Sequence, residues 1–143
     1  MQTVAHILQS KNSQAIYTIS PDATVLEALS LMAEKKIGAL VVTQQQKVVG
    51  IISERDYARK VALMERSSYS TTVSEIMTHA VLTVTPKHST EHCMQLMTDK
   101  HLRHLPVVEN DQLTGLVSIG DLVKNVMAQQ QSLIDQLQEY ISG

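Results

Sequence analysis

The order of hydrophobic and polar residues in this chain recurs after 65 positions. Short apolar stretches alternate with polar turns, and the polar or apolar character of paired positions mostly matches even where the residues differ. Several individual residues also recur at this spacing: Pro21 and Pro86, Met32 and Met97, Gly50 and Gly115, Ser53 and Ser118, Asp56 and Asp121. Two such copies predict two similar units related by a pseudo-twofold axis, with related sites in a shared cleft.

Each copy has the pattern strand, helix, strand, strand, helix. Thr24 followed by Glu27 has the spacing of a capping box, in which a hydroxyl and a carboxylate satisfy free N–H groups at a helix start. The first copy predicts a strand at 16–19, a helix with apolar positions 25, 29, 32 and 33 on one face, strands at 40–42 and 48–52, and a second helix opened by Ser53. The second copy repeats these elements from 81 to 126. Pro106 falls within one of its strands, which indicates an edge or strand-start position.

A short segment of related sequence precedes each copy, at 3–7 and at 72–76, and is called the lead-in of that copy. The pattern predicts a first repeat with its lead-in at 1–65, a second repeat with its lead-in at 66–128, and a helical tail at 129–143. The last helix continues beyond the repeat with an apolar stripe that Gln130 interrupts: Val123, Met127, Ile134, Leu137 and Ile141. We expect this stripe to pack on the body or on a second subunit, and fraying of the terminus is the alternative.

Composition excludes several classes of protein. The net charge is −2, and Phe and Trp are absent, so neither electrostatics nor base stacking favours nucleic acid as a partner. The apolar runs are too short to span a membrane. The first residues lack the basic and then apolar pattern of a signal peptide. Cys93 is the single cysteine, which rules out an internal disulfide. A cytoplasmic protein is expected.

A strand that ends in Ser-x-x-Asp at a helix start occurs in both copies, at 50–56 and at 115–121. A helix N-terminus presents free N–H groups and a partial positive charge, which attract phosphate. A serine hydroxyl there adds a hydrogen bond, and an aspartate one turn later can accept from the two hydroxyls of a ribose. The same residue types also cap ordinary helices, so spacing alone leaves both interpretations open.

The segments 50–56 and 101–108, each within a duplicated β-α-β-β-α unit, resemble the cystathionine β-synthase (CBS) domain. The resemblance covers both copies and nearly the whole chain, and order, spacing and duplication agree. It implies an α/β fold in which two pseudo-twofold-related β-α-β-β-α CBS repeats form one module, with no catalytic or transport domain attached.

The resemblance also implies an adenosyl nucleotide, AMP, ADP, ATP or NAD(H), in the cleft between the repeats, and no required cofactor. The motif aspartates would take the ribose hydroxyls, and nearby hydroxyl and basic groups the phosphate. Residues carried over from the first copy are Thr18, Ile37, Gly38, Ala39, Ser53, Arg55 and Asp56. Residues carried over from the second copy are Thr83, Leu102, Arg103, His104, Pro106, Ser118 and Asp121. Because Gly38-Ala39 corresponds to Arg103-His104, and Arg55 to Gly120, we expect unequal sites, of which one can be empty.

Other chemistries find less support in the sequence. His88 and His92 have helical spacing for two metal ligands, as do His101 and His104, but no third and fourth ligands are defined, so no metal site is predicted. Cys93 takes the place of Ala28 in the first copy and is expected to be a small buried residue.

His104, Ser118 and Asp121 supply the residue types of a catalytic triad. The Gly-x-Ser-x-Gly elbow is absent, however, and capping explains the Ser–Asp spacing, so no enzymatic activity is predicted.

The resulting hypothesis is a sensor in which a nucleotide stabilises one arrangement of repeats or subunits and changes contact with an unknown regulated protein. A homodimer is expected, because apolar helix faces remain open and twofold dimers are the commonest assembly. Neither nucleic acid nor membrane is an expected partner. The alternative is a ligand-independent module for dimerisation or protein interaction.

Overall fold

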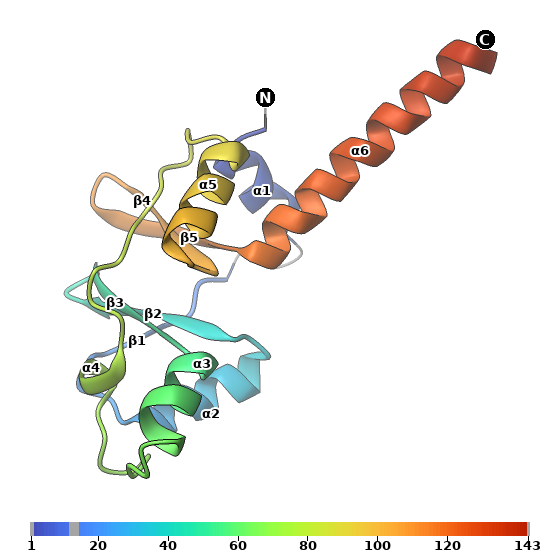
Figure 1. The fold of residues 1–143 in the computed structure, drawn as a ribbon. Coiled ribbons are helices and arrows are strands. Elements are labelled where there is room, and N and C mark those ends of the chain that lie inside the picture. The colour runs from blue at the N-terminus through green and yellow to red at the C-terminus, as the bar shows by residue number, and fades with distance from the viewer. Residues whose placement is uncertain (1, 12–14, 143) are drawn as a thin grey trace.

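The computed structural model describes residues 2–11 and 15–142. Two similar α/β units form the body, and the last helix extends away from it (Figure 1). The first unit contains β1 (Thr18–Ile19), α2 (Val25–Lys35), β2 (Ala39–Gln44), β3 (Lys47–Ser53) and α3 (Glu54–Tyr57), which runs into the π-helical turn η1 (Ala58–Ala62). The second unit contains α5 (Thr90–Lys100), β4 (His104–Glu109), β5 (Gln112–Ser118) and α6 (Ile119–Ser142). Two short helices, α1 (Val4–Ser10) and α4 (Val73–Ile76), precede the units.

The strands of the first unit pair in the order β1-β2-β3, parallel and then antiparallel. The second unit keeps the antiparallel pair β4-β5, but the strand expected from position 81 is reduced to a single bridge at Val84. The N–H of Val84 donates to the Pro106 carbonyl at 3.0 Å, and the N–H of Val108 donates to the Val84 carbonyl at 2.8 Å. Extension of this pairing toward residue 82 would need an N–H on Pro106, which proline lacks. Pro106 therefore lies at the edge of a two-stranded sheet, as predicted.

The helix starts follow the sequence pattern closely. The Thr24 hydroxyl accepts from the Glu27 N–H at 3.1 Å, and the Glu27 carboxylate accepts from the Thr24 N–H at 3.3 Å, which confirms the capping box. On α2 the buried face consists of Val25, Ala28 and Met32. The expectation that Ala33 shares this face was wrong, because Ala33 lies at the margin of the stripe and is exposed.

Each lead-in helix packs in the core of the other repeat. Val4 and Ile7 of α1 are buried with Leu105 and Val117 of the second unit, while α4 is buried in the first unit. A β-bridge between Thr3 and Ser89 joins the first lead-in to the second unit, and a β-bridge between Thr72 and Thr24 joins the second lead-in to the first unit. The predicted boundaries grouped each lead-in with the repeat that follows it, whereas in space the chain crosses between the units and ties them together.

The repeated glycines allow these crossings. A Cβ atom on Gly115 would lie 2.8 Å from Cδ1 of Leu8 in the lead-in, and one on Gly50 would overlap the side chain of Met77. Such distances are shorter than real Cβ contacts, so a larger residue at either position would displace the Leu8 or Met77 side chain that lies against the strand. Gly50 and Gly115 therefore recur for packing of the two lead-ins.

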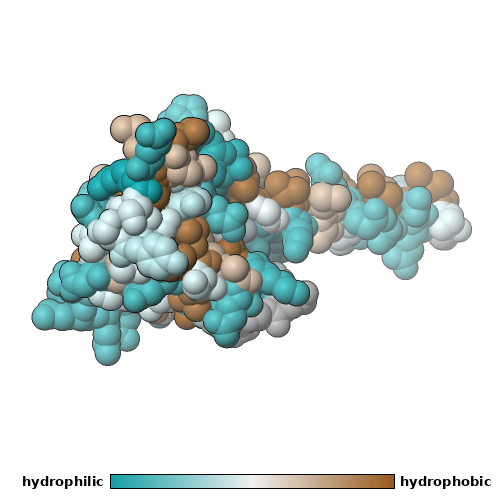
Figure 2. Space-filling model, turned by 90° about the horizontal axis from the view of Figure 1, so that it is seen from below, coloured by the Kyte–Doolittle hydropathy of each residue, from teal (hydrophilic) through white to brown (hydrophobic). Residues whose placement is uncertain are grey.

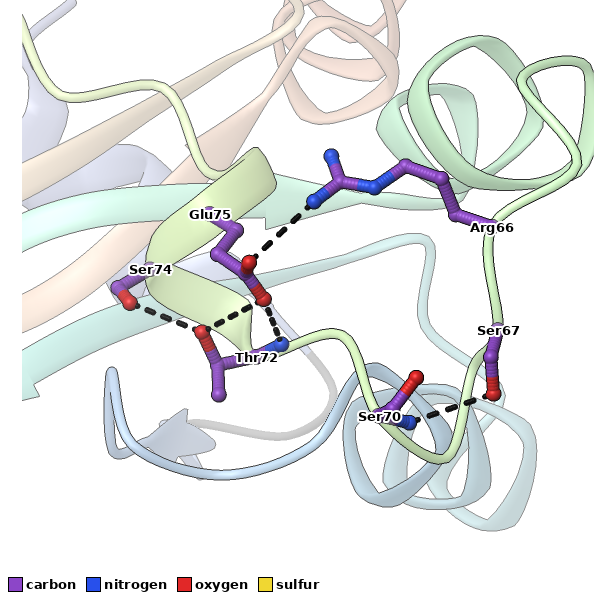
Figure 3. A network of polar contacts seen from close by, with 6 residues as sticks. All are labelled: Arg66, Ser67, Ser70, Thr72, Ser74 and Glu75. Carbon is purple, nitrogen blue, oxygen red and sulfur yellow. Dashed lines mark hydrogen bonds and ion pairs between the residues drawn. The ribbon is translucent and has the colours of Figure 1, made fainter.

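The polar connection between the units forms its own network (Figure 3). Glu75 accepts from the N–H of Thr72 at 2.6 Å and pairs with Arg66 at 3.3 Å, while Ser67 accepts from the N–H of Ser70 at 3.3 Å. The N–H of Thr72 is the main cause that holds the pKa of Glu75 below its ordinary value. This network secures the start of α4, where the chain enters the first unit.

Candidate functional site

A cleft of about 800 Å³ lies between the two units. Residues 15–17, Lys35 and the segment 37–39 line it from the first unit. The end of α1, strand β5 and the first three turns of α6 line it from the other side. The cleft therefore combines both repeats and the crossing lead-in.

Fourteen residues were expected to bind a nucleotide, and the structure separates them into two groups. Those that line this cleft are Ile37, Gly38, Ala39, His104, Ser118 and Asp121. Those that lie elsewhere are Thr18, Ser53, Arg55, Asp56, Thr83, Leu102, Arg103 and Pro106. The cleft thus joins the start of β2 in the first repeat with the Ser-x-x-Asp motif of the second.

Several members of the second group have other surroundings. Thr18 and Thr83 are exposed, whereas Pro106 is buried and Leu102 packs against the second core. Arg55 lies close enough to the positive charge of Arg103 for that charge to be the main cause of a lowered Arg55 pKa. These two arginines therefore mark a second, basic location on the surface of the module.

Both Ser-x-x-Asp motifs form capping boxes. The Ser118 N–H donates to Oδ2 of Asp121 at 2.9 Å, and the Asp121 N–H donates to the Ser118 hydroxyl at 3.1 Å. Ser53 and Asp56 make the same pair of bonds at 2.9 and 3.2 Å. The capping interpretation is thus established, and any ligand contact must use the remaining carboxylate capacity. An ionised carboxylate has about four lone-pair sites, so capacity remains.

Lys11 completes the environment of Asp121. Its ammonium lies 3.1 Å from Oδ2 of Asp121 and donates to the Leu116 carbonyl at 2.8 Å. Burial alone would raise the pKa of Asp121, but the Ser118 N–H and the Lys11 ammonium outweigh it and hold that pKa below its ordinary value. Asp121 is therefore ionised at neutral pH. No local motif marks Lys11, because it directly follows α1, which crosses to the second unit from the other end of the chain.

His104 lies half-buried in the same cleft. Burial lowers its pKa from the ordinary 6.5, and the nearby charges of Lys11 and Arg103 add to this, although Asp121 acts in the opposite direction. The imidazole is therefore neutral at pH 7 and can either donate or accept a hydrogen bond.

The cleft carries more positive than negative charge. Lys11, Lys35 and Lys124 line it, and Asp121 is the one acidic residue among the described residues that do so. Asn125 also lines the cleft, and its Oδ1 is buried without a partner in the described part of the chain. A buried acceptor of this kind gains from a hydrogen-bond donor on a ligand. Sequence reasoning missed Asn125, since it lies one turn beyond the motif.

The corresponding location in the first repeat is built differently. Lys60 of the same helical segment lies 3.2 Å from Asp56 and donates to the Ile76 carbonyl at 2.9 Å. The backbone of Ile51 pairs with Thr78 through two hydrogen bonds of 2.9 and 3.1 Å. At the matching position of the second repeat, the Leu116 carbonyl instead accepts from Lys11. The two motif locations are therefore unequal in geometry.

Neither a metal-binding cluster nor a membrane-spanning helix is present among the described residues. Within residues 2–11 and 15–142, no group of three or more His, Cys, Asp or Glu is placed to hold a metal ion. The rings of His88 and His92 stack at 4.3 Å, and His88 accepts from the Thr85 N–H at 2.9 Å. No helix in the described part of the chain has the length and apolar character needed to cross a bilayer.

A pair of α/β repeats with crossed lead-ins and a shared cleft defines this molecule as a tandem-repeat module. The family model for the CBS domain matches residues 4–63 and again 73–128, and the chain belongs to that family. This confirms the predicted tandem CBS pair and its α/β fold.

Individual relatives agree with the family assignment. The chain is 40% identical over 149 residues to the CBS domain-containing protein CBSX3, mitochondrial, of Arabidopsis thaliana, which covers 99% of this chain and 72% of that protein. It superposes with a TM-score of 0.86 on a protein with CBS domains from Burkholderia ambifaria, at 53% identity, covering 90% of this chain and 96% of that one. The structure of CBSX2 in complex with AMP is similar at a TM-score of 0.74 and 25% identity, covering 90% of this chain and 98% of that one.

Proposed function

We propose that this chain is a regulatory module that binds an anionic adenosine nucleotide in the cleft between its repeats and thereby changes its contact with a partner protein. The observation that carries the proposal is the convergence of Asp121 and three lysines on a cleft built from both repeats. The AMP complex of CBSX2, which shares the fold, supports the ligand class.

Each wall of the cleft has a role in this proposal. Asp121 accepts from the ribose hydroxyls through Oδ1, because Oδ2 already bonds Ser118 and Lys11. Gly38 and Ala39 leave room for the flat adenine base. Lys11, Lys35 and Lys124 attract the phosphate groups.

The charge of the cleft narrows the ligand class. Three lysines against one aspartate favour AMP, ADP, ATP or NAD(H), which carry phosphate, over a cationic adenosyl compound such as a sulfonium. The other predicted location, at Asp56, has its own basic group in Arg55 and Arg103. We propose that it binds the same class of ligand with a different affinity.

The nucleotide acts in this proposal without any catalysis by the module. It stabilises one arrangement of the repeats or of two subunits, and the energy available is limited to its difference in affinity for the two arrangements. The module itself is expected to be a homodimer that acts on a regulated protein, and the cytoplasm is its expected location.

The second candidate function is a ligand-independent interaction module. The capping boxes favour it, because they explain both Ser-x-x-Asp motifs through helix stability alone. Removal of the Asp121 charge separates the two candidates, since an uncharged amide keeps the cap but bonds ribose hydroxyls less strongly.

Calorimetric titration with AMP, ADP, ATP and NADH tests the proposal, with S-adenosylmethionine as the cationic comparison. Asp121→Asn should weaken binding at least tenfold, while the matched variant Asp56→Asn should leave binding in the large cleft unchanged. A ligand at one hundred times its dissociation constant should also add about 2.7 kcal/mol of stability. Absence of binding by all four nucleotides at millimolar concentration would establish the ligand-independent candidate instead.

A further inference from the structure

Helix α6 lies against the body through its first turns. Residues 129–142 are all exposed, so the apolar stripe predicted from the sequence does not pack on the body. In Figure 2 hydrophobic side chains gather along one edge of this projecting part and hydrophilic side chains along the other. In the first turns, Asp121, Lys124, Asn125 and Ala128 all line the large cleft. Positions three and four apart are neighbours on one face of a helix, so this face belongs to the candidate nucleotide site.

The carboxylate of Asp121 has one engaged oxygen and one free oxygen. Oδ2 accepts from the Ser118 N–H at 2.9 Å and pairs with the Lys11 ammonium at 3.1 Å, which occupies both of its lone pairs. Oδ1 forms no hydrogen bond or ion pair with any described residue. The two hydroxyls of a ribose bond a carboxylate best when each has an oxygen of its own. At Asp121 they find a single free oxygen, so one hydroxyl needs another acceptor.

Asn125 lies one helical turn beyond Asp121 and carries such an acceptor. Its Oδ1 is buried with no partner among the described residues, and its Nδ2 donates to Oε1 of Gln2 at 3.4 Å, which is long for a hydrogen bond. A buried acceptor without a donor costs free energy, so the amide is poorly satisfied in this position. A rotation about its Cβ–Cγ bond would therefore give up only the long bond to Gln2.

The first repeat shows that a side chain at this position reaches the motif aspartate. Asn125 corresponds to Lys60 in the sequence repeat. The Lys60 ammonium lies 3.2 Å from Oδ1 of Asp56, four positions earlier, and the Ser53 N–H donates to Oδ2, so both oxygens of Asp56 are engaged. The second repeat has a neutral amide in place of this lysine and leaves Oδ1 of Asp121 free. The amide is also shorter than lysine, which leaves space for a hydroxyl group between the two side chains.

We propose that Asp121 and Asn125 divide the two hydroxyls of a ribose between them, so that the large cleft selects ribonucleotides over deoxyribonucleotides. This inference rests on the proposed nucleotide function. Oδ1 of Asp121 accepts from one hydroxyl, and Oδ1 of Asn125 turns into the cleft and accepts from the other. Loss of either hydroxyl leaves an acceptor without its donor, and a site built to bond a hydroxyl rejects ligands that lack it. The location at Asp56, where Lys60 and Ser53 occupy the carboxylate, does not make this distinction.

Calorimetric titration of the full-length chain with AMP, 2′-deoxy-AMP and 3′-deoxy-AMP tests this division. An Asp56→Asn parent protein confines the measurement to the large cleft. The parent should bind each deoxy analogue about tenfold more weakly than AMP, as expected for the loss of one hydrogen bond. Addition of Asn125→Leu keeps the size of the side chain but removes the acceptor. This variant should bind one deoxy analogue as well as it binds AMP, while the other analogue stays about tenfold weaker because Asp121 still bonds the hydroxyl that it lacks.

Lys124→Met is the matched control, since Lys124 lies on the same face of α6 and is assigned to the phosphate groups. It should weaken all three ligands by the same factor and leave the ratios of their dissociation constants unchanged. A ratio within one variant cancels any general effect of the substitution on the fold. Equal affinity of the parent for all three ligands, or ratios that Asn125→Leu leaves unchanged, would overturn the division of the hydroxyls while AMP binding still upholds the proposed function. Absence of AMP binding to the parent at millimolar concentration would overturn both.

Discussion

The ion pair between Lys11 and Asp121 joins the two ends of the chain and offers a sharp test of the structure. Lys11→Met keeps the length of the side chain but removes the ammonium that lies 3.1 Å from Asp121 and 2.8 Å from the Leu116 carbonyl. The pair is largely screened from water, with side-chain exposures of 29% and 16%. Hydrogen bonds to charged groups contribute about 1.5–3 kcal/mol, so a loss of about 2 kcal/mol at pH 7 is expected.

The pH dependence identifies the cause of this loss. Because folding lowers the pKa of Asp121 from 3.8, its charged form contributes stability above that value, and the contribution disappears as the pH falls through the lower folded pKa. The difference between wild type and Lys11→Met should therefore be full at pH 7 and shrink in strong acid, where Asp121 is protonated in both proteins.

Urea unfolding at pH 7 and at acidic pH measures this difference directly. Lys124→Met is the matched control, since Lys124 lines the same cleft without a hydrogen bond or ion pair to any described residue, and it should cost less than about 0.5 kcal/mol. An equal loss for both lysine variants, or a loss from Lys11→Met that does not change with pH, would contradict the assigned role of the ion pair.

Three further predictions follow from individual side chains. Burial lowers the pKa of His104 below 6.5, so protonation of its imidazole opposes folding. The wild type should therefore lose stability relative to His104→Gln as the pH falls below 6.5. A difference in melting temperature between the two proteins that stays constant from about pH 7 to 5 would contradict this. Gly50→Ala should cost about 1–3 kcal/mol, because the new Cβ would overlap the Met77 side chain and lie 3.0 Å from the backbone carbonyl of Thr78, while Gly38→Ala, with open space around it, should melt like wild type. Burial raises the pKa of the Cys93 thiol, so a thiol reagent should react slowly in the folded protein and rapidly in urea; fast reaction before unfolding would show that the thiol is accessible.

Local features of this fold were predictable because neighbouring residues determine them. The capping box of Thr24 and Glu27 and the edge position of Pro106 each depend on residues within one turn or one strand. The duplication predicted two equivalent units, since similar patterns favour similar local structures. Burial at the margin of a helix still depended on the neighbouring elements, because Ala28 of α2 is buried whereas Ala33 of the same helix is exposed.

The composition of the cleft depended on how the chain crosses between the units. The sequence supplied Gly38 and Asp121 as candidates, but only the tertiary structure brings them to one cleft and places Arg55 and Asp56 elsewhere. Residues that no local motif marks, such as Lys11, reach the cleft through the crossed lead-in.

What the sequence alone determined about this protein is its repeat architecture, its helix caps and the tandem CBS family it resembles. What only the tertiary structure decided is which copy of each motif faces the cleft, which charge balances Asp121 and which face of α6 remains open. The physical reason is the distance along the chain between the residues that interact. Caps and periodic stripes arise from interactions between residues a few positions apart, whereas the contact between Lys11 and Asp121 depends on burial of α1 in the distant second core.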